Sequence, residues 1–384
     1  MRPNSALLSF TSAALALPGI AIAPVQASEA VNALTAAYEF AYYHENDDRM
    51  RVEAHQAYLA MPINDQAKFS LDLVRDIVSG ASPIFNLPPA QAGGPAVQVL
   101  SGASIHEERT AANLHGSYAL EDLDLSATLG VSDEHDYRSR SASLESRWSF
   151  NQKNTTLSVG AGLSDDDIEP TKQNFHDTKR TTSALLGLTQ TLSPTDLLQF
   201  NLTYGHNNGY LSDPYKQVFI QGAGIQRDSR PRSRDQWTLM GRYAHFLSDW
   251  DAALQFDYRY YRDDWGVRGH TLEARLHKPL GDGFELVPLL RYHSQSGADF
   301  YQPYFTSTPA DGYYSSDYRL ADFGAFSVGL RLNKDLKLLG KNAQFNTRLE
   351  YYDSNANYKL GSSRADIPAP LSFYLISLGL SVAF

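Results

Sequence analysis

The sequence has no cysteine, no long apolar run after its first residues and no excess of positive charge. A chain without cysteine fits export through an oxidising compartment, where an unpaired thiol is a liability, and it cannot be acylated as a lipoprotein is. No stretch beyond residue 27 approaches the roughly 18–20 consecutive apolar residues of a spanning helix, so a helical membrane protein is excluded. A formal net charge of -10 argues against nucleic acid as a partner.

Aromatic residues are plentiful in this otherwise polar chain. It has 23 tyrosines and 18 phenylalanines, although hydrophobic residues make up only 42% of the sequence. Strands of a transmembrane barrel are apolar on one face only, and aromatic girdles mark both membrane boundaries. The composition is therefore typical of a membrane-spanning β-barrel.

The N-terminal stretch has the organisation of a secretory signal peptide. Arg2 precedes an alanine-rich apolar run from Ala6 to Ala23, and Val25-Gln26-Ala27 supplies small residues for cleavage. The run is too short and too rich in small residues for a stable spanning helix. We expect residues 1–27 to be removed and residues 28–384 to form a single domain.

The C-terminal stretch from Ser372 to Phe384 alternates apolar and small residues with a period of two. This pattern predicts a strand with one apolar face, which meets either lipid or the core of a soluble sandwich. The stretch resembles the closing strand of bacterial outer-membrane barrels, in which the terminal aromatic residue is part of the signal read by the barrel-assembly machinery. The resemblance implies that Phe384 has this role and that the partners are outer-membrane lipid and that machinery.

Between these ends the chain repeats one unit, in which two alternating segments joined by a short turn are followed by a longer polar loop. This repeat predicts consecutive hairpins. We expect an all-β, up-and-down antiparallel barrel of about 16 strands, with 14 or 18 as alternatives because the segments near Ala103 and Tyr215 are weak. Short turns then lie in the periplasm and long loops outside the cell.

The turns and loops are predicted from residues that reverse the chain cheaply. The short turns are Pro62 to Asp65, Glu121-Asp122, Asn151 to Asn154, Ser193 to Asp196, Ser248-Asp249, Gly281 to Gly283 and the less tight Asn333 to Asn342. The long loops are His44 to Arg49, Ser79 to Gly102, Asp133 to Tyr137, Ser164 to Asp177, Asn207 to Ser233, Arg262 to Arg268, Ser296 to Asp317 and Asp353 to Pro370.

The clearest strands separate an apolar face from a charged one. An arginine facing lipid near the bilayer midplane costs roughly 2–4 kcal/mol, so the charged face must line the lumen. This lumen-lining set is Arg242, Asp257, Arg259, Glu273, Arg275, His277, Glu285, Arg291, His293, Arg331, Arg348 and Glu350. The charges either solvate and brace the wall or select a charged solute, as rings of charge do in pores. A barrel of this size is wide enough for an aqueous channel unless a loop or a partner fills it.

Motifs for chemistry are sparse, and we predict no catalytic residue, no cofactor and no metal site. His106-Glu107-Glu108 lacks the second histidine of a zinc hydrolase motif. The stretch Tyr204 to Gly209 offers a histidine and asparagines but no nucleophile for a barrel lipid hydrolase. Asp165-Asp166-Asp167 with Glu169 has the hard oxygen ligands of a calcium loop, or is a solvated acidic loop.

Several ordered motifs carry a family resemblance that spans almost the whole mature chain. They are Gly209-Tyr-Leu-Ser-Asp-Pro-Tyr-Lys216, Asp76-Ile-Val-Ser-Gly-Ala-Ser-Pro83, Tyr260-Tyr-Arg-Asp-Asp-Trp-Gly266, Ala298-Asp-Phe-Tyr301 and Ser316-Asp-Tyr-Arg-Leu320. With them the chain resembles the bacterial outer-membrane proteins grouped as domain of unknown function 3570. The resemblance implies an outer-membrane barrel that serves an envelope redox system and has a periplasmic lipoprotein, flavin-attaching or thioredoxin-like partner.

The loop motif Ser212, Asp213, Pro214 and Tyr215 has a physical interpretation of its own, because proline restricts the residue before it and aspartate bonds its own backbone. The small residues of Ser79 to Pro83 suit a loop that folds inward.

Three functions follow as alternatives: a porin-like channel for small solutes, charged ones among them; a non-conducting scaffold or conduit for the redox system; and a barrel enzyme such as a lipid hydrolase.

Overall fold

The structure is a computed structural model that describes residues 33–46, 49–80, 83–91, 96–100, 105–171, 173–361 and 371–384. Residues 1–27, for which a signal peptide is predicted, lie outside the described residues. No helix in these ranges is long and apolar enough to cross a membrane.

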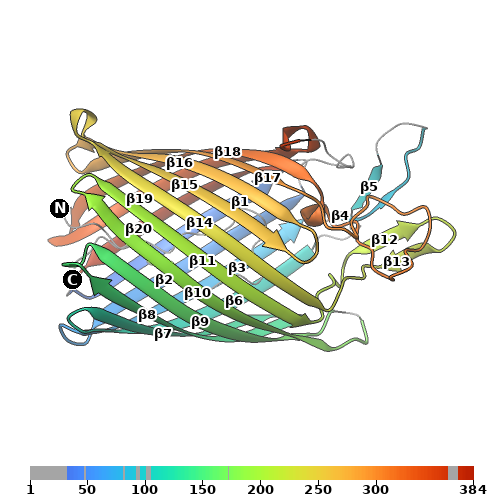
Figure 1. Cartoon of the computed structure of the whole chain (residues 1–384), viewed down its shortest axis with the longest axis horizontal. Coiled ribbons are helices and arrows are strands. Elements are labelled where there is room, and N and C mark those ends of the chain that lie inside the picture. Colours follow the sequence, from blue (N-terminus) through green and yellow to red (C-terminus); the bar gives the residue numbers. More distant parts are fainter. Residues whose placement is uncertain are drawn as a thin grey trace.

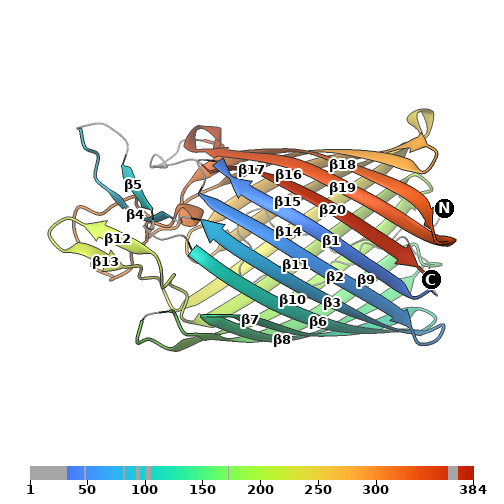
Figure 2. The ribbon, with the colours of Figure 1, turned by 180° about the vertical axis from the view of Figure 1, so that it is seen from behind.

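Sixteen antiparallel strands form one closed barrel, as predicted (Figures 1 and 2). Each strand pairs with its neighbours in chain order, and β1 pairs with β20 to close the ring. The barrel strands are β1 (Thr35–Glu45), β2 (Met50–Pro62), β3 (Ala67–Gly80), β6 (Ile105–Ala119), β7 (Leu123–Glu134), β8 (Tyr137–Phe150), β9 (Thr155–Ile168), β10 (Asp177–Ser193), β11 (Asp196–Gly209), β14 (Ser233–Leu247), β15 (Ala252–Asp263), β16 (Arg268–Gly281), β17 (Phe284–Gln295), β18 (Phe323–Leu338), β19 (Lys341–Asn355) and β20 (Ser372–Ala383).

Four short strands lie outside the barrel. They form the hairpins β4 (Pro83–Leu87) with β5 (Val97–Leu100) and β12 (Gln217–Ile220) with β13 (Gly224–Arg227). These hairpins explain the weak segments near Ala103 and Tyr215: the chain forms strands close to both places, but they leave the barrel count at sixteen. Both hairpins project beyond the same end of the barrel (Figure 1). The 3-10 helices η2 (Ser248–Trp250), η3 (Tyr318–Leu320) and η4 (Ala356–Tyr358), each of a single turn, lie in connections.

The first and last strands pair along their whole length. Thr35 lies opposite Ala383 and Glu45 lies opposite Phe373, so the ring closes without a gap. The backbone N–H of Phe384 donates to the carbonyl of Leu34 at 2.8 Å, while its side chain is exposed. Closure removes both edges of the sheet, whose backbone N–H and C=O groups would find no hydrogen-bond partner in hydrocarbon. The role of Phe384 in assembly stays a prediction.

Exposure separates the two faces of the wall as the sequence pattern predicts. Leu144 is 68% exposed, Val328 60% and Leu272 55%, and all three alternate with residues that point inward. On β20, Ile376, Leu378 and Leu380 point outward, whereas Ser377 and Ser381 are buried on the inner face. An outward apolar band with a polar inner face is the arrangement that lipid outside and water inside select.

Three connections are tighter than predicted. The stretch Asn333 to Asn342 continues β18 and β19 and turns at Leu339-Gly340 alone, where both residues have positive φ. Asp133 to Tyr137 reduces to the two residues between β7 and β8. Ser164 to Asp177 is strand as far as Ile168. In each case polar residues indicated a loop, although in this barrel polar residues also face the lumen or the aqueous ends of the strands.

The two faces of β15 give a direct test of this assignment. Phe256→Arg places a charge on the lipid face and should lower the free energy of unfolding by about 2–4 kcal/mol. Gln255→Arg, one residue away on the inner face between Asp257 and Arg275, is the matched control and should lose less than about 1 kcal/mol. Urea unfolding of the purified barrel in lipid vesicles measures both. Equal losses in the two variants would show that the faces are assigned wrongly.

Candidate functional site

The twelve ionisable residues predicted to line the lumen all lie on the inner face of β14 to β19. Their register shows it: Asp257 lies opposite both Arg242 and Glu273, and Glu273 lies opposite Arg291. The residues between them, such as Phe256 and Leu290, are the exposed apolar ones. The charged wall is thus one continuous patch that covers six neighbouring strands.

Ion pairs link this patch across the strands. Arg242 donates to Asp257 through Nε at 2.7 Å and through Nη2 at 2.9 Å, which is a bidentate pair. Glu273 receives Arg291 Nε at 2.5 Å and also pairs with Arg275. Asp257 therefore pairs with one arginine and Glu273 with two.

The chain of pairs crosses β18 without using a charged residue of that strand. Arg291 Nη1 donates to Glu350 Oε1 on β19 at 3.1 Å, and Arg348 pairs with the other carboxylate oxygen. The residues of β18 that lie between them are Ser327 and Gly329. Small side chains at these positions let Arg291 and Glu350 meet over the strand.

The remaining predicted residues fall into two groups. Glu285 accepts from Asn333 at 2.6 Å and lies 3.4 Å from His277, and His293 lies 2.9 Å from the hydroxyl of Thr271. Arg259 and Arg331, by contrast, form no hydrogen bond or ion pair with another side chain in the described ranges. Arg259 is exposed and Arg331 is half-buried.

A second sector of the wall, from β7 to β11, carries fewer charges, which the sequence analysis did not identify. Its inner face presents hydroxyl groups, amides and glycines, with the internal ion pairs Glu145–Arg147 and Asp166–Lys179. Examples are Thr128, Gly130, Ser143, Gly162, Ser183, Gly187 and Asn201. Small polar residues at alternate positions were the signal. The lumen therefore has a charged sector, β14 to β19, and a hydroxyl-rich sector, β7 to β11.

The end of the barrel opposite the termini is packed by loops. Two connections, residues 264–267 and 296–322, fold against the inner wall, and we call them the cap. Phe300, Tyr301 and Leu320 of the cap share a buried apolar cluster with the inner-face residues Tyr43 and Phe373 of the barrel. Tyr43 and Phe373 are each only 1% exposed. The cap fills the part of the mouth next to β1, β2, β18, β19 and β20.

Two of the family motifs meet inside the cap. Trp265 is buried, and its ring contacts Phe300 edge-on at 5.1 Å between centroids. The backbone N–H of Asp299 donates to the carbonyl of Trp265 at 2.9 Å. The Arg234 guanidinium lies 4.2 Å from the Trp265 ring centroid and pairs with Asp263 at 2.6 Å. These contacts fix the connection between β15 and β16 to the loop after β17.

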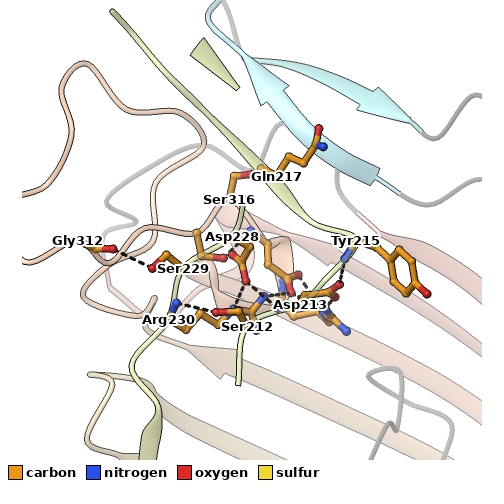
Figure 3. Close-up of polar contacts among 12 residues, drawn as sticks. Ser212, Asp213, Tyr215, Gln217, Asp228, Ser229, Arg230, Gly312 and Ser316 are labelled. Atoms are coloured by element: carbon orange, nitrogen blue, oxygen red, sulfur yellow. Dashed lines mark hydrogen bonds and ion pairs between the residues drawn. The ribbon is translucent and has the colours of Figure 1, made fainter. Parts of the chain in front are cut away.

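A buried ion network joins the loop motif Ser212 to Tyr215 to the cap (Figure 3). Arg319 binds Asp213 at 2.6 Å through Nη2 and Asp317 at 2.9 Å through Nε. Arg230 binds Asp317 at 2.9 Å and Asp228 at 2.6 Å. Asp317 and Asp228 are almost fully buried. We call these five residues the cap network.

The loop motif also contacts two other connections. Tyr215 donates its hydroxyl to Asp136 and accepts from the backbone N–H of Thr171 at 3.2 Å. Gln173 Nε2 donates to the carbonyl of Pro214 at 3.0 Å. The backbone N–H of Tyr215 donates to Asp213 Oδ1 at 3.0 Å, which is the local turn predicted for this motif. Ser212 accepts from the Arg230 backbone N–H at 2.9 Å (Figure 3).

The carboxylates of the cap network respond differently to burial. Burial alone would raise the pKa of Asp317, but Arg319, Arg230 and Lys216 hold that pKa well below its ordinary value. The pKa of Asp213 is lowered in the same way by Arg319 and Lys216. Burial raises the pKa of Asp228, and Arg230 only partly opposes this. Asp317 is therefore the charged centre of the network.

The candidate chemical motifs do not assemble into a reactive set. Asp165 to Asp167 lie on β9 instead of in a loop; Asp165 pairs with Arg180 at 2.7 Å and Asp166 pairs with Lys179 at 2.9 Å. His206 pairs with Asp235 at 2.8 Å on the outer face. Glu107 and Glu108 lie on β6, and the side chain of His106 is outside the described part of the structure. The described residues hold no cluster of three or more metal-ligating side chains.

A family model described as "Protein of unknown function (DUF3570)" matches residues 7–175 and 169–375. A search of the curated proteins finds no match to the sequence.

Solved structures share the fold at low identity. A "Bacterial polysaccharide outer membrane secretin" is 9% identical with a TM-score of 0.50, over 93% of this chain and 100% of that chain. CdiB from Acinetobacter baumannii is 10% identical with a TM-score of 0.51, over 91% of this chain and 61% of that chain. The outer membrane protein opdK from Pseudomonas aeruginosa is 12% identical with a TM-score of 0.44, over 91% of this chain and 98% of that chain. The first two likenesses show an outer-membrane barrel fold and nothing finer.

Neutralising Asp317 tests whether the cap network holds the cap. Asp317→Asn leaves Arg230 and Arg319 without their shared carboxylate, and removing one partner of a buried ion pair costs about 3–5 kcal/mol. We expect residues 296–322 to become sensitive to protease and to exchange amide hydrogens faster, while the barrel keeps its heat-modifiable migration. Asp311→Asn, at an exposed position of the same loop, is the control. Unchanged protection in Asp317→Asn would exclude the network as the main restraint.

The cap should also respond to pH with a defined sign. The pKa values of Asp213 and Asp317 are lowered in the folded state, so their charged carboxylates stabilise the docked cap at any pH above the ordinary aspartate pKa of about 3.9. This stabilisation is lost as the pH falls through the lower pKa of the folded state. The raised pKa of Asp228 acts oppositely, because its protonation favours the docked state. Hydrogen exchange of residues 296–322, corrected for intrinsic rates, should therefore show protection that holds or rises on mild acidification and falls only below about pH 4. Loss of protection between neutral and mildly acidic pH would contradict this.

Proposed function

This chain belongs to the family described as Protein of unknown function (DUF3570), and we propose that it is a porin-like channel of the outer membrane whose outer mouth is narrowed by the cap. The observation that carries the proposal is the inner wall of the barrel. Its charged sector, β14 to β19, and its hydroxyl-rich sector, β7 to β11, both present polar groups inward, on strands whose other face is apolar. A polar interior in a barrel of this size supports a hydrated path for small solutes.

The pairing of the charges supports a path for solutes and not only a braced wall. The ion pairs join side chains on the inner face of β14 to β19, which is the face that borders the lumen. Where an arginine pairs with a carboxylate, its remaining N–H groups can still bind a passing solute. On β7 to β11, serine, threonine and asparagine offer donors and acceptors that tolerate many polar molecules. Small polar solutes are therefore the proposed cargo, and anions are favoured beside β14 to β19, where the predicted set holds six arginines and four carboxylates.

The cap favours a second candidate, a non-conducting scaffold or conduit. Its buried ion network and apolar cluster fix it firmly in the mouth, and the hairpins β4–β5 and β12–β13 project at the same end. β12 lies against β4, so the two hairpins form one raised platform. The family resemblance associates such a barrel with a redox system in the envelope. Under this alternative the platform or the periplasmic turns would hold a partner, and the lumen would pass nothing.

Conductance of the purified barrel in a planar bilayer separates the two candidates. We expect the wild type to conduct with a low or intermittent current, since the cap narrows the mouth. Asp317→Asn, which loosens the cap, should raise the open-channel current or the open fraction, and Asp311→Asn should leave both unchanged. Reconstituted vesicles with a dye too large to pass serve as the control for leaks. If neither the wild type nor the Asp317→Asn variant carries current, the channel proposal is contradicted and the scaffold is favoured.

A further inference from the structure

Two arginines of the charged wall lack the partners that the other arginines have. Among the six predicted lumen arginines, Arg242, Arg275, Arg291 and Arg348 each pair with a carboxylate. Arg259 and Arg331 do not pair with any side chain in the residues that the structure describes. Arginine remains charged at any physiological pH, so each of these two guanidinium groups needs either water or a ligand.

Arg331 occupies the more unusual position of the two. It lies directly opposite Arg348 in the register of β18 with β19, and on its other side it lies opposite Val287 of β17. Like charges directly opposite each other on one face of a sheet are destabilising. Arg348 has turned to Glu350, but Arg331 has an arginine on one side and an apolar residue on the other.

The carboxylates around Arg331 do not neutralise it. Glu285 is bound by Asn333 and lies beside His277. Glu285 and Glu39, which lies on β1, both attract Arg331, but neither forms an ion pair with it. Arg275 and Arg348 both repel Arg331. Three arginines therefore face one region near the middle of β16, β18 and β19, and one of them, Arg331, forms no hydrogen bond with any side chain among the described residues. A local violation of charge pairing of this kind is typical of functional sites.

We propose that Arg331, with Arg275 and Arg348 beside it, forms an oxyanion-binding site in the lumen that takes a small solute through its carboxylate or phosphate group. An oxyanion would satisfy the N–H groups of Arg331 and remove its repulsion with Arg348. The site lies at mid-strand, below the cap, so a solute that passes through the lumen meets it. The inference deepens the proposed function, on which it rests for the route of the solute.

The test measures binding, so it does not depend on whether the lumen conducts. The detergent-folded, full-length barrel is unfolded in urea with and without succinate, inorganic phosphate or the uncharged succinamide. A ligand that binds the folded state raises the urea midpoint in proportion to its occupancy. Succinate and phosphate represent the two sources of the oxyanion, and the larger midpoint shift at equal concentration identifies the preferred group. Succinamide should give no shift.

Arg331→Gln and Arg242→Gln make a matched pair, because each removes one positive charge from the same wall. Arg331→Gln should weaken oxyanion binding by about tenfold, the loss of one charge-assisted hydrogen bond, and Arg242→Gln by less than about threefold. Without ligand, the midpoint of Arg331→Gln should equal or exceed the wild-type value, because a repulsive pair is removed. Arg242→Gln should lower the midpoint, since Asp257 loses its bidentate partner.

Three results would overturn the site: no shift of the wild type with either anion, an equal loss of binding in both variants, or a ligand-free Arg331→Gln barrel that is less stable than Arg242→Gln. The last would make Arg331 a structural brace. If the barrel binds the anion at Arg331 but carries no current, the proposed channel function is excluded and the binding site is retained. The two failures are therefore distinguishable.

Discussion

The need to bond every backbone amide within the membrane controls this structure. Hydrocarbon offers no partner for a free N–H or carbonyl, so the sheet must close on itself. Closure through β1 and β20 makes both faces of the wall continuous around the ring, and the two-residue period then assigns each side chain to lipid or lumen. The ion pairs of β14 to β19 follow from this, because charges excluded from one face gather on the other.

The periodicity of the sequence predicted the wall well. Strand number and closure follow from alternation, since the pattern reports the solvent on each side. It failed at the strand ends, where Asp165 and Asn333 lie on strands although they suggested loops. Beyond the bilayer both faces are wet, so polar residues no longer distinguish strand from loop.

The cap could not be derived from local pattern, because it depends on contacts distant in sequence. The motifs that carried the family resemblance do mark it: Asp213, Trp265, Phe300 and Arg319 all take part. Which of them meet is decided by the barrel, which brings the ends of β11, β15 and β17 to one mouth. The pairing of Asp213 with Arg319, and the absence of an ion-pair partner for Arg331 among the described residues, could be seen only in the three-dimensional structure. The wall of the lumen therefore follows from the two-residue alternation in the sequence, whereas the cap at its entrance follows from packing between distant segments.

The long sequence separations within the cap have a consequence for the order of assembly. Asp213 and Arg319 are 106 positions apart, and the apolar cluster joins the cap to both β1 and β20. Contacts this distant form late, because the intervening chain must first be placed. The cap can complete its contacts only after the last strand has joined the first. Docking of the cap is therefore a late step in the maturation of the barrel.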